Sequence, residues 1–136
     1  MSSDVFYETQ IRVRYDEADP MGFVHHSNYL RYLEICRTEA LRAAGGNYRE
    51  VEAAGIMIVV VRADLRYRQP ARYDDLLTIR LRLGTPSRAK VEHHYEVYRD
   101  GQLLTQAELT LAAINSEGKV QPLPEWATQL HPTPSP

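Results

Sequence analysis

The sequence has little cysteine, little lysine and no long apolar run in its 136 residues. The single cysteine, Cys36, excludes an internal disulfide. No stretch of about 18 apolar residues occurs, so neither a membrane span nor a signal peptide is supported, and we expect a cytoplasmic protein. The net charge of −2 argues against a nucleic-acid binder that depends on bulk positive charge.

Sulfur and imidazole groups are also too few or too badly spaced for metal chemistry. Cys36 lies on the apolar side of a predicted helix, so we expect a buried thiol and not a nucleophile. The histidines occur mainly as two adjacent pairs, His25-His26 and His93-His94. Neighbouring side chains on a strand point to opposite faces, and no second cluster has ligand spacing. We therefore expect no metal and no cofactor.

The length and composition are those of one globular domain. The chain is 43% hydrophobic and 25% charged, within the ordinary globular range. Five of the eight prolines fall between Pro122 and Pro136. We therefore predict a folded domain over residues 1–120 and a proline-rich tail over residues 121–136 that is extended or disordered.

The chain begins with a predicted half-buried strand that leads into a polar loop. Apolar and polar residues alternate from Thr9 to Tyr15, with the Tyr15 side chain expected to point toward the core and into the loop. The loop DEADPMG cannot continue the strand, because Pro20 lacks a donor and Gly22 allows a backbone conformation closed to other residues.

One long amphipathic helix is predicted over about residues 27 to 44. Its apolar residues recur at spacings of three and four, and charged residues share the opposite face. The apolar set is Tyr29, Leu30, Leu33, Cys36, Ala40, Leu41, Ala43 and Ala44. Gly45-Gly46 ends the helix, and a weaker helical segment is predicted over residues 47–54.

Four strands are predicted after the helix. The first starts near Gly55 and is expected to be buried on both faces at residues 56–61 and on one face later. The next two alternate over residues 77–83 and 90–97, and the last runs over about residues 103–114, after a hairpin signal at Asp100-Gly101. The order predicts an α+β fold in which a curved, antiparallel, five-stranded sheet wraps around one long central helix.

A signature lies where the first strand meets the helix. Within RYDEADPMGFVHHSNYLRYLE, the pattern is Tyr15, Asp19, Gly22, His26, Asn28 and Tyr29. This pattern resembles the 4-hydroxybenzoyl-CoA thioesterase family of hotdog-fold proteins, especially its YbgC-like acyl-CoA thioesterase branch. The segment YRQPARYDD, residues 67–75, resembles the family's strand-turn-strand connection. The resemblance implies hydrolysis of an acyl-CoA thioester without a metal or a serine nucleophile.

The resemblance also assigns catalytic roles. The family's catalytic aspartate falls on Asp19, as nucleophile or general base, and the associated tyrosine and histidine fall on Tyr15 and His26. Thioester hydrolysis also needs donors for an oxyanion, and the backbone N–H groups of Gly22 and His26 are the candidates. The neighbouring acids Asp16 and Glu17 are expected to be solvated.

Two departures from the family pattern concern the acyl group. Glu17-Ala18 stands where Asp-Thr is more usual, and Phe23-Val24-His25 replaces a run that is commonly Val-Val-Tyr. In the family these neighbours line the acyl pocket. The acyl group therefore stays open, aromatic or aliphatic.

Substrate binding and assembly complete the prediction. Arg88 and Lys90 open the strand after the turn at residues 85–87 and are candidates to hold the CoA phosphates, and Asn28 is a third candidate substrate-binding residue. A small curved sheet cannot cover its own helix and edges, and the resemblance implies sheets joined edge to edge. We expect a homodimer or homotetramer with a shared site.

Other interpretations of the loop stay open. Asp16, Glu17 and Asp19 are also what an Asx-type turn would contain without any catalysis. A hotdog enzyme acting on acyl-carrier-protein thioesters, a dehydratase with a loop histidine and a helix acid such as Glu34, and a non-catalytic acyl-CoA binder are the alternatives.

Overall fold

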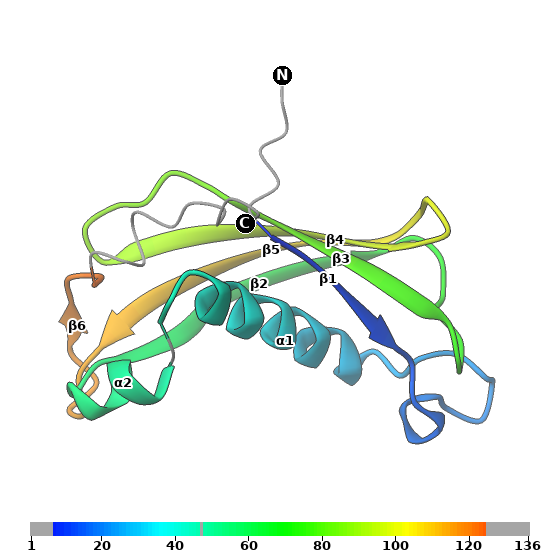
Figure 1. Cartoon of the computed structure of the whole chain (residues 1–136), viewed down its shortest axis with the longest axis horizontal. Helices are drawn as coiled ribbons and strands as arrows, with labels where there is room; N and C mark the ends of the chain where they lie inside the picture. Colours follow the sequence, from blue (N-terminus) through cyan, green and yellow to red (C-terminus); the bar gives the residue numbers. More distant parts are fainter. Residues whose placement is uncertain (1–6, 47, 125–136) are drawn as a thin grey trace.

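The computed structural model describes residues 7–46 and 48–124 as one curved sheet with a long helix against it (Figure 1). The helices are α1 (Ser27–Ala43), α2 (Tyr48–Ala53) and a 3-10 turn, η1 (Tyr15–Glu17). The strands are β1 (Tyr7–Arg12), β2 (Met57–Tyr67), β3 (Leu76–Leu83), β4 (Lys90–Arg99), β5 (Gln102–Ile114) and β6 (Val120–Gln121). All pairs are antiparallel in the order β1-β3-β4-β5-β2, and β6 adds to β5. The predicted α+β arrangement is confirmed.

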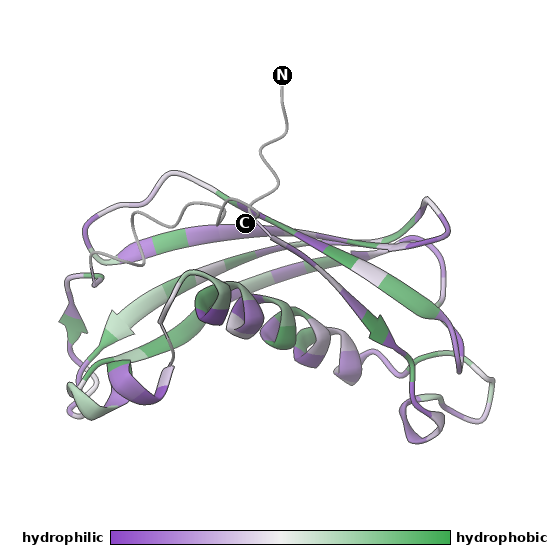
Figure 2. Cartoon of the chain, in the orientation of Figure 1, coloured by the Kyte–Doolittle hydropathy of each residue, from purple (hydrophilic) through white to green (hydrophobic). Residues whose placement is uncertain are grey.

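The sheet arches over α1, and the core lies between them. Along β3 and β4 buried positions alternate with more exposed ones, which is the period-two pattern of a strand with one face in the core. Hydrophobic and hydrophilic residues accordingly interleave along the helix and strands (Figure 2). The buried cluster includes Leu33, Leu77, Ile79, Leu81, Val97, Leu104 and Leu109.

The predicted apolar face of α1 is confirmed at Tyr29, Leu33, Cys36, Ala40 and Leu41. Three residues assigned to it, Leu30, Ala43 and Ala44, are exposed, whereas Tyr32, which was not assigned to it, is 1% exposed. Cys36 is fully buried, and burial raises the pKa of its thiol to about 12. The prediction of a buried cysteine is therefore confirmed.

Strand β2 differs from its prediction. Burial on both faces is wrong, because β2 lies at the edge of the sheet and pairs with β5 alone among the described residues. Met57, Val60 and Val61 are exposed, and the register shifts between Val60 and Arg62, as at a β-bulge. An apolar run thus borders an unpaired strand edge.

The turn between β4 and β5 forms where the sequence predicts a hairpin. Asp100 and Gly101 both have positive φ, 50° and 80°, as a two-residue hairpin loop requires.

In the predicted tail, Leu123 is buried against Val91 and Leu111. Residues 125–136 of that tail, and Asn47 at the start of the predicted short helix, lie outside the described residues. No helix in the described part of the chain is long and apolar enough to cross a membrane.

The two adjacent histidines on β4 point to opposite faces, as predicted. His93 is buried, with Nδ1 3.1 Å from the Tyr95 hydroxyl, whereas His94 lies on the outer face near Glu92 and Glu108. Burial, and then the positive charge of Arg37, lowers the pKa of His93 from 6.5 to about 3. The folded protein therefore keeps His93 neutral.

Neutral burial of His93 should make stability depend on pH. The unfolded chain protonates this group near pH 6.5 and the folded chain does not until about pH 3. Stability is therefore fully present above pH 6.5 and should fall by about 1.4 kcal/mol per pH unit as pH decreases from 6.5 toward 3. Chemical denaturation of His93→Gln should show a shallower decrease over this range. His94→Gln is the matched control and should keep the wild-type slope; equal slopes for all three proteins would contradict the assignment.

Candidate active site

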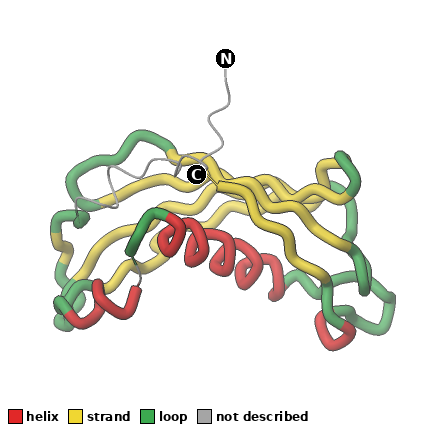
Figure 3. Tube along the Cα trace, viewed as in Figure 1, coloured by secondary structure: helices red, strands yellow, loops and turns green. Residues whose placement is uncertain are grey.

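The loop between β1 and α1 folds into a small hairpin at one end of the sheet (Figure 3). At its base the Glu17 carbonyl accepts from His25 N–H at 2.9 Å, and nearer the tip Asp19 N–H donates to the Phe23 carbonyl at 2.8 Å. Ala18 and Val24 pair between them. The predicted strand therefore ends at Arg12, and the polar loop has a defined structure of its own.

Asp19 lies at the turn of this hairpin and is half-buried. Its Oδ1 accepts from the backbone N–H groups of Met21, at 2.9 Å, and Phe23, at 3.2 Å. These are the contacts of the predicted Asx-type turn. No hydrogen bond found among the described residues ends on Oδ2, so one carboxylate oxygen makes the turn and the other is available.

A pocket of about 350 Å³ opens beside Asp19. Three segments form it: the hairpin, the start of α1, and the connection that follows β2. Its walls are mostly apolar or aromatic, with four polar or charged side chains. The lining residues are Asp19, Phe23, Val24, His26, Tyr29, Tyr67, Arg68, Gln69 and Pro70.

His26 reaches the same pocket from the helix start. It is the N-cap residue of α1, and its carbonyl accepts from Tyr29 N–H at 3.3 Å. Its own N–H enters no hydrogen bond found in the described chain. The His25 and His26 rings lie 4.2 Å apart between centroids. Asp19 and His26 are thus brought together as predicted, with an unused N–H at the positive end of a helix.

Two predicted partners of Asp19 take other positions. Tyr15 was expected to point toward the core, but it is 80% exposed and its ring contacts Tyr73. It is also absent from the pocket lining and makes no hydrogen bond to Asp19 among the described residues. Gly22 was a candidate oxyanion donor, but its N–H already donates to the Asp19 carbonyl at 2.8 Å. What the turn requires of Gly22 is its φ of +86°.

Two polar residues predicted for other roles fasten the loop. Asn28 was expected to bind substrate, but it is buried and its Nδ2 donates to the Glu17 carbonyl at 3.0 Å. Glu17 was expected to be solvated, yet it is buried and accepts from the Tyr32 hydroxyl at 2.8 Å. The prediction for Glu17 was wrong because sequence spacing alone did not reveal that helix α1 packs on the loop, whereas substrate binding by Asn28 stays a prediction.

Arg88 and Lys90 lie far from this pocket within one chain. Lys90 pairs with Ala112 of β5, whereas pocket residue Tyr67 pairs with Thr105 of β5. Seven residues of strand separate these rows, which corresponds to roughly 23 Å. The loop between β3 and β4 and the loop between β1 and α1 lie at opposite ends of the sheet (Figure 1). A single chain cannot place both cations beside Asp19.

The sequence reasoning missed the wall contributed by the end of β2. Tyr67 makes an edge contact with Tyr29, at 5.1 Å between ring centroids, and Arg68 Nε donates to Gln106 at 2.8 Å. Phe23 is covered by the Arg72 guanidinium at 4.8 Å. The available signal was Gln69-Pro70, which stops the strand and turns the chain beside the loop.

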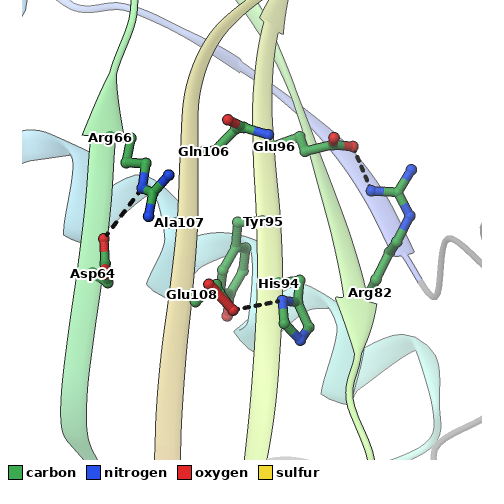
Figure 4. A pocket seen from close by; sticks show the side chains of 9 residues that line it. All are labelled: Asp64, Arg66, Arg82, His94, Tyr95, Glu96, Gln106, Ala107 and Glu108. Atoms are coloured by element: carbon green, nitrogen blue, oxygen red, sulfur yellow. Dashed lines mark hydrogen bonds and ion pairs between the residues drawn. The ribbon is translucent and has the colours of Figure 1, made fainter.

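A second, polar pocket of about 380 Å³ lies on the outer face of the sheet (Figure 4). Its charged groups pair with one another: Arg66 with Asp64 along β2 at 3.9 Å, and, across neighbouring strands, His94 with Glu108 at 3.5 Å and Arg82 with Glu96. Each carboxylate of this pocket lies near a basic side chain, and all of the lining residues are on strands, so no helix N-terminus lies beside it as one does beside Asp19. Within the described residues, no group of three His, Cys, Asp or Glu could hold a metal.

The helix acid that a dehydratase would require is not at the pocket. The Glu34 side chain is 66% exposed and lies 3.8 Å from Arg37 on the same helix. It is also absent from the pocket lining. The dehydratase alternative therefore lacks one of its two catalytic groups here.

Comparison with known proteins identifies the family to which the chain is similar. A family model described as the thioesterase-like superfamily matches residues 13–130. The acyl-CoA thioesterase YbgC of Haemophilus influenzae is 28% identical over 114 residues, which cover 83% of this chain and 83% of that protein.

Solved structures extend the likeness to three dimensions. A hypothetical protein from Thermus thermophilus is 37% identical with a TM-score of 0.83, covering 92% of this chain and 99% of that one. The DHNA-CoA thioesterase of Staphylococcus aureus is 27% identical with a TM-score of 0.83, covering 86% of this chain and 80% of that one. The chain therefore belongs to the thioesterase-like superfamily and has the hotdog fold of its thioester-hydrolysing relatives.

Proposed function

We propose that this protein hydrolyses an acyl-CoA to the free acid and CoA, with Asp19 as the catalytic carboxylate. The observation that supports this most is that Asp19, with one available carboxylate oxygen, and His26, with an unused backbone N–H, line the same pocket. Relatives named as acyl-CoA thioesterases support the substrate class. Neither a serine nucleophile nor a metal is needed for this chemistry.

Two routes use these groups equally well. As a general base, Asp19 takes a proton from water while the water oxygen bonds to the thioester carbon; the tetrahedral intermediate then collapses, the C–S bond breaks, and the CoA sulfur receives a proton. As a nucleophile, the Asp19 carboxylate displaces CoA to form an anhydride that water then hydrolyses. In both, the carbonyl oxygen gains charge beside the His26 N–H.

The free edge of β2 supports a dimer built by pairing this strand with its copy. An unpaired strand edge with exposed Met57, Val60 and Val61 is costly to leave in water. The end of β2 also carries Tyr67, a pocket residue. A second copy on this edge would therefore lie next to the pocket.

The dimer also gives Arg88 and Lys90 a role. In antiparallel pairing about a two-fold axis, the start of one β2 lies beside the end of the other. Lys90 lies in the row of residues that crosses the sheet near the start of β2, because Ala112 pairs with both Lys90 and Val59. The cations of one protomer would thus approach the pocket of its partner, where CoA phosphates could be held.

Substitutions at Asp19 separate catalysis from turn formation. Asn keeps the Oδ1 that accepts from Met21 and Phe23 but removes the charge, whereas Ala removes both. Asp19→Asn should therefore keep the melting temperature and lower kcat by at least about 10²-fold with little change in KM. Asp19→Ala should lose activity and also stability.

Asp16→Asn is the control for the Asp19 substitutions. Asp16 is an exposed acid of the same loop, and Asp16→Asn should cost less than about tenfold in kcat. If Asp19 only forms the turn, Asp19→Asn will remain active while Asp19→Ala unfolds more easily. Steady-state kinetics and thermal melts of the three variants decide between these accounts.

Mixed dimers test the shared site. One chain carries Asp19→Asn and the other Arg88→Ala/Lys90→Ala, with different affinity tags so that only the mixed species is recovered. If the cations act across the interface, both lesions fall in one site and the other site is intact. Activity at substrate concentrations below KM should then be about half that of the wild type.

The opposite outcome has a clear signature. If all groups act within one chain, each site carries one lesion, and the activity of the mixed dimer is the average of those of the two parent homodimers. Light scattering of the wild type provides the first check, because a mass of 15.6 kDa would exclude the dimer at that concentration.

A further inference from the structure

Glu17 has the most enclosed carboxylate in the loop that carries Asp19. Oε1 accepts two hydrogen bonds of 2.8 Å, one from Arg14 N–H behind it and one from the Tyr32 hydroxyl on α1. A buried carboxylate is costly unless it is hydrogen-bonded in this way. Its position therefore fixes the distance between the loop and the second turn of the helix.

The backbone of Glu17 is held from the same helix. Its carbonyl accepts from Asn28 Nδ2 at 3.0 Å and from His25 N–H at 2.9 Å. Asn28 and Tyr32 are four residues apart and lie on one face of α1. Two helix side chains thus hold both the side chain and the main chain of one loop residue.

The position of Glu17 in the hairpin connects these contacts to Asp19. One residue, Ala18, separates them along one arm, and it pairs with Val24 on the other arm. That second arm is tied to the connection between β2 and β3 by Val24 N–H, which donates to the Ala71 carbonyl at 2.8 Å. The helix therefore holds one arm, and the β2–β3 connection holds the other.

We propose that Glu17 is a positioning residue that, through Tyr32, holds the Asp19 carboxylate at the pocket. This inference rests on the proposed function and identifies a group outside the pocket on which the reaction depends. A displacement of about 1 Å at a reacting group can cost on the order of 10²-fold in rate. The contact requires an acceptor at Glu17 and a donor at Tyr32, not a negative charge.

The protonation of Tyr32 agrees with the donor role. Burial, and then the hydrogen bond to Glu17, raises the pKa of the Tyr32 hydroxyl far above its usual value of 10. The hydroxyl therefore keeps its proton at any pH used for assay. It is therefore able to donate to the Glu17 carboxylate.

Three substitutions test the requirement for an acceptor and a donor. Glu17→Gln keeps an oxygen that can accept from both Arg14 and Tyr32, so kcat should stay within about threefold of the wild type. Glu17→Ala and Tyr32→Phe each break the contact, and kcat should fall at least about tenfold with KM nearly unchanged. Because both remove one interaction, the double variant should lose little more than Glu17→Ala alone.

Hydrogen–deuterium exchange provides a readout that does not depend on activity. Amides of residues 17–25 should exchange faster in Glu17→Ala and Tyr32→Phe, while those of β3 and β4 stay as in the wild type. Asp16→Ala, at the exposed neighbour, should change neither exchange nor kcat. If Glu17→Ala does not fold, Tyr32→Phe still carries the test.

The possible outcomes separate this inference from the proposed function. Wild-type exchange and kcat in Tyr32→Phe would overturn the positioning role even if the enzyme is an active thioesterase. Faster loop exchange together with no thioesterase activity in the wild type would instead refute the proposed function. A kcat loss in Glu17→Gln as large as in Glu17→Ala would overturn the acceptor requirement.

Discussion

Burial of the apolar face of α1 is the constraint on which the rest of this structure depends. A single helix of 17 residues can hide that face only if the sheet curves around it. The curvature leaves the start of the helix at one end of the sheet, beside the loop that follows β1. It also leaves β2 as an edge with exposed apolar residues. The pocket and the exposed edge of β2 are therefore both consequences of one packing requirement.

The loop allows one side chain to form the turn and to take the proposed catalytic role. Asp19 Oδ1 satisfies two backbone N–H groups of the turn, and Oδ2 remains available at the pocket. An aspartate that only closed a turn would have no reason to lie beside a helix N-terminus with an unused N–H. The turn and the proposed catalysis are thus compatible, because Oδ1 forms the turn and Oδ2 is left for the reaction.

Periodicity predicted the elements, but not which edge or contact each would have. The five long strands and α1 follow from alternation and three-four spacing, and the signature brought Asp19 and His26 together correctly. Polar residue type was misleading elsewhere, because the burial of Glu17 and Asn28 becomes evident only when α1 is seen to pack on the loop. Tyr15 leaves the strand because the chain turns into η1 after Arg14. For β2, apolar composition indicated burial, whereas its exposed run lies on an unpaired edge.

The most direct measurement is the release of free thiol by the wild-type protein from a panel of aromatic and aliphatic acyl-CoAs, with acyl-carrier-protein thioesters assayed in parallel. The account predicts catalytic release of CoA from at least one acyl-CoA, at a higher kcat/KM than for the corresponding carrier-bound thioester. Binding of acyl-CoA without any thiol release, or turnover of carrier-bound thioesters alone, would contradict it.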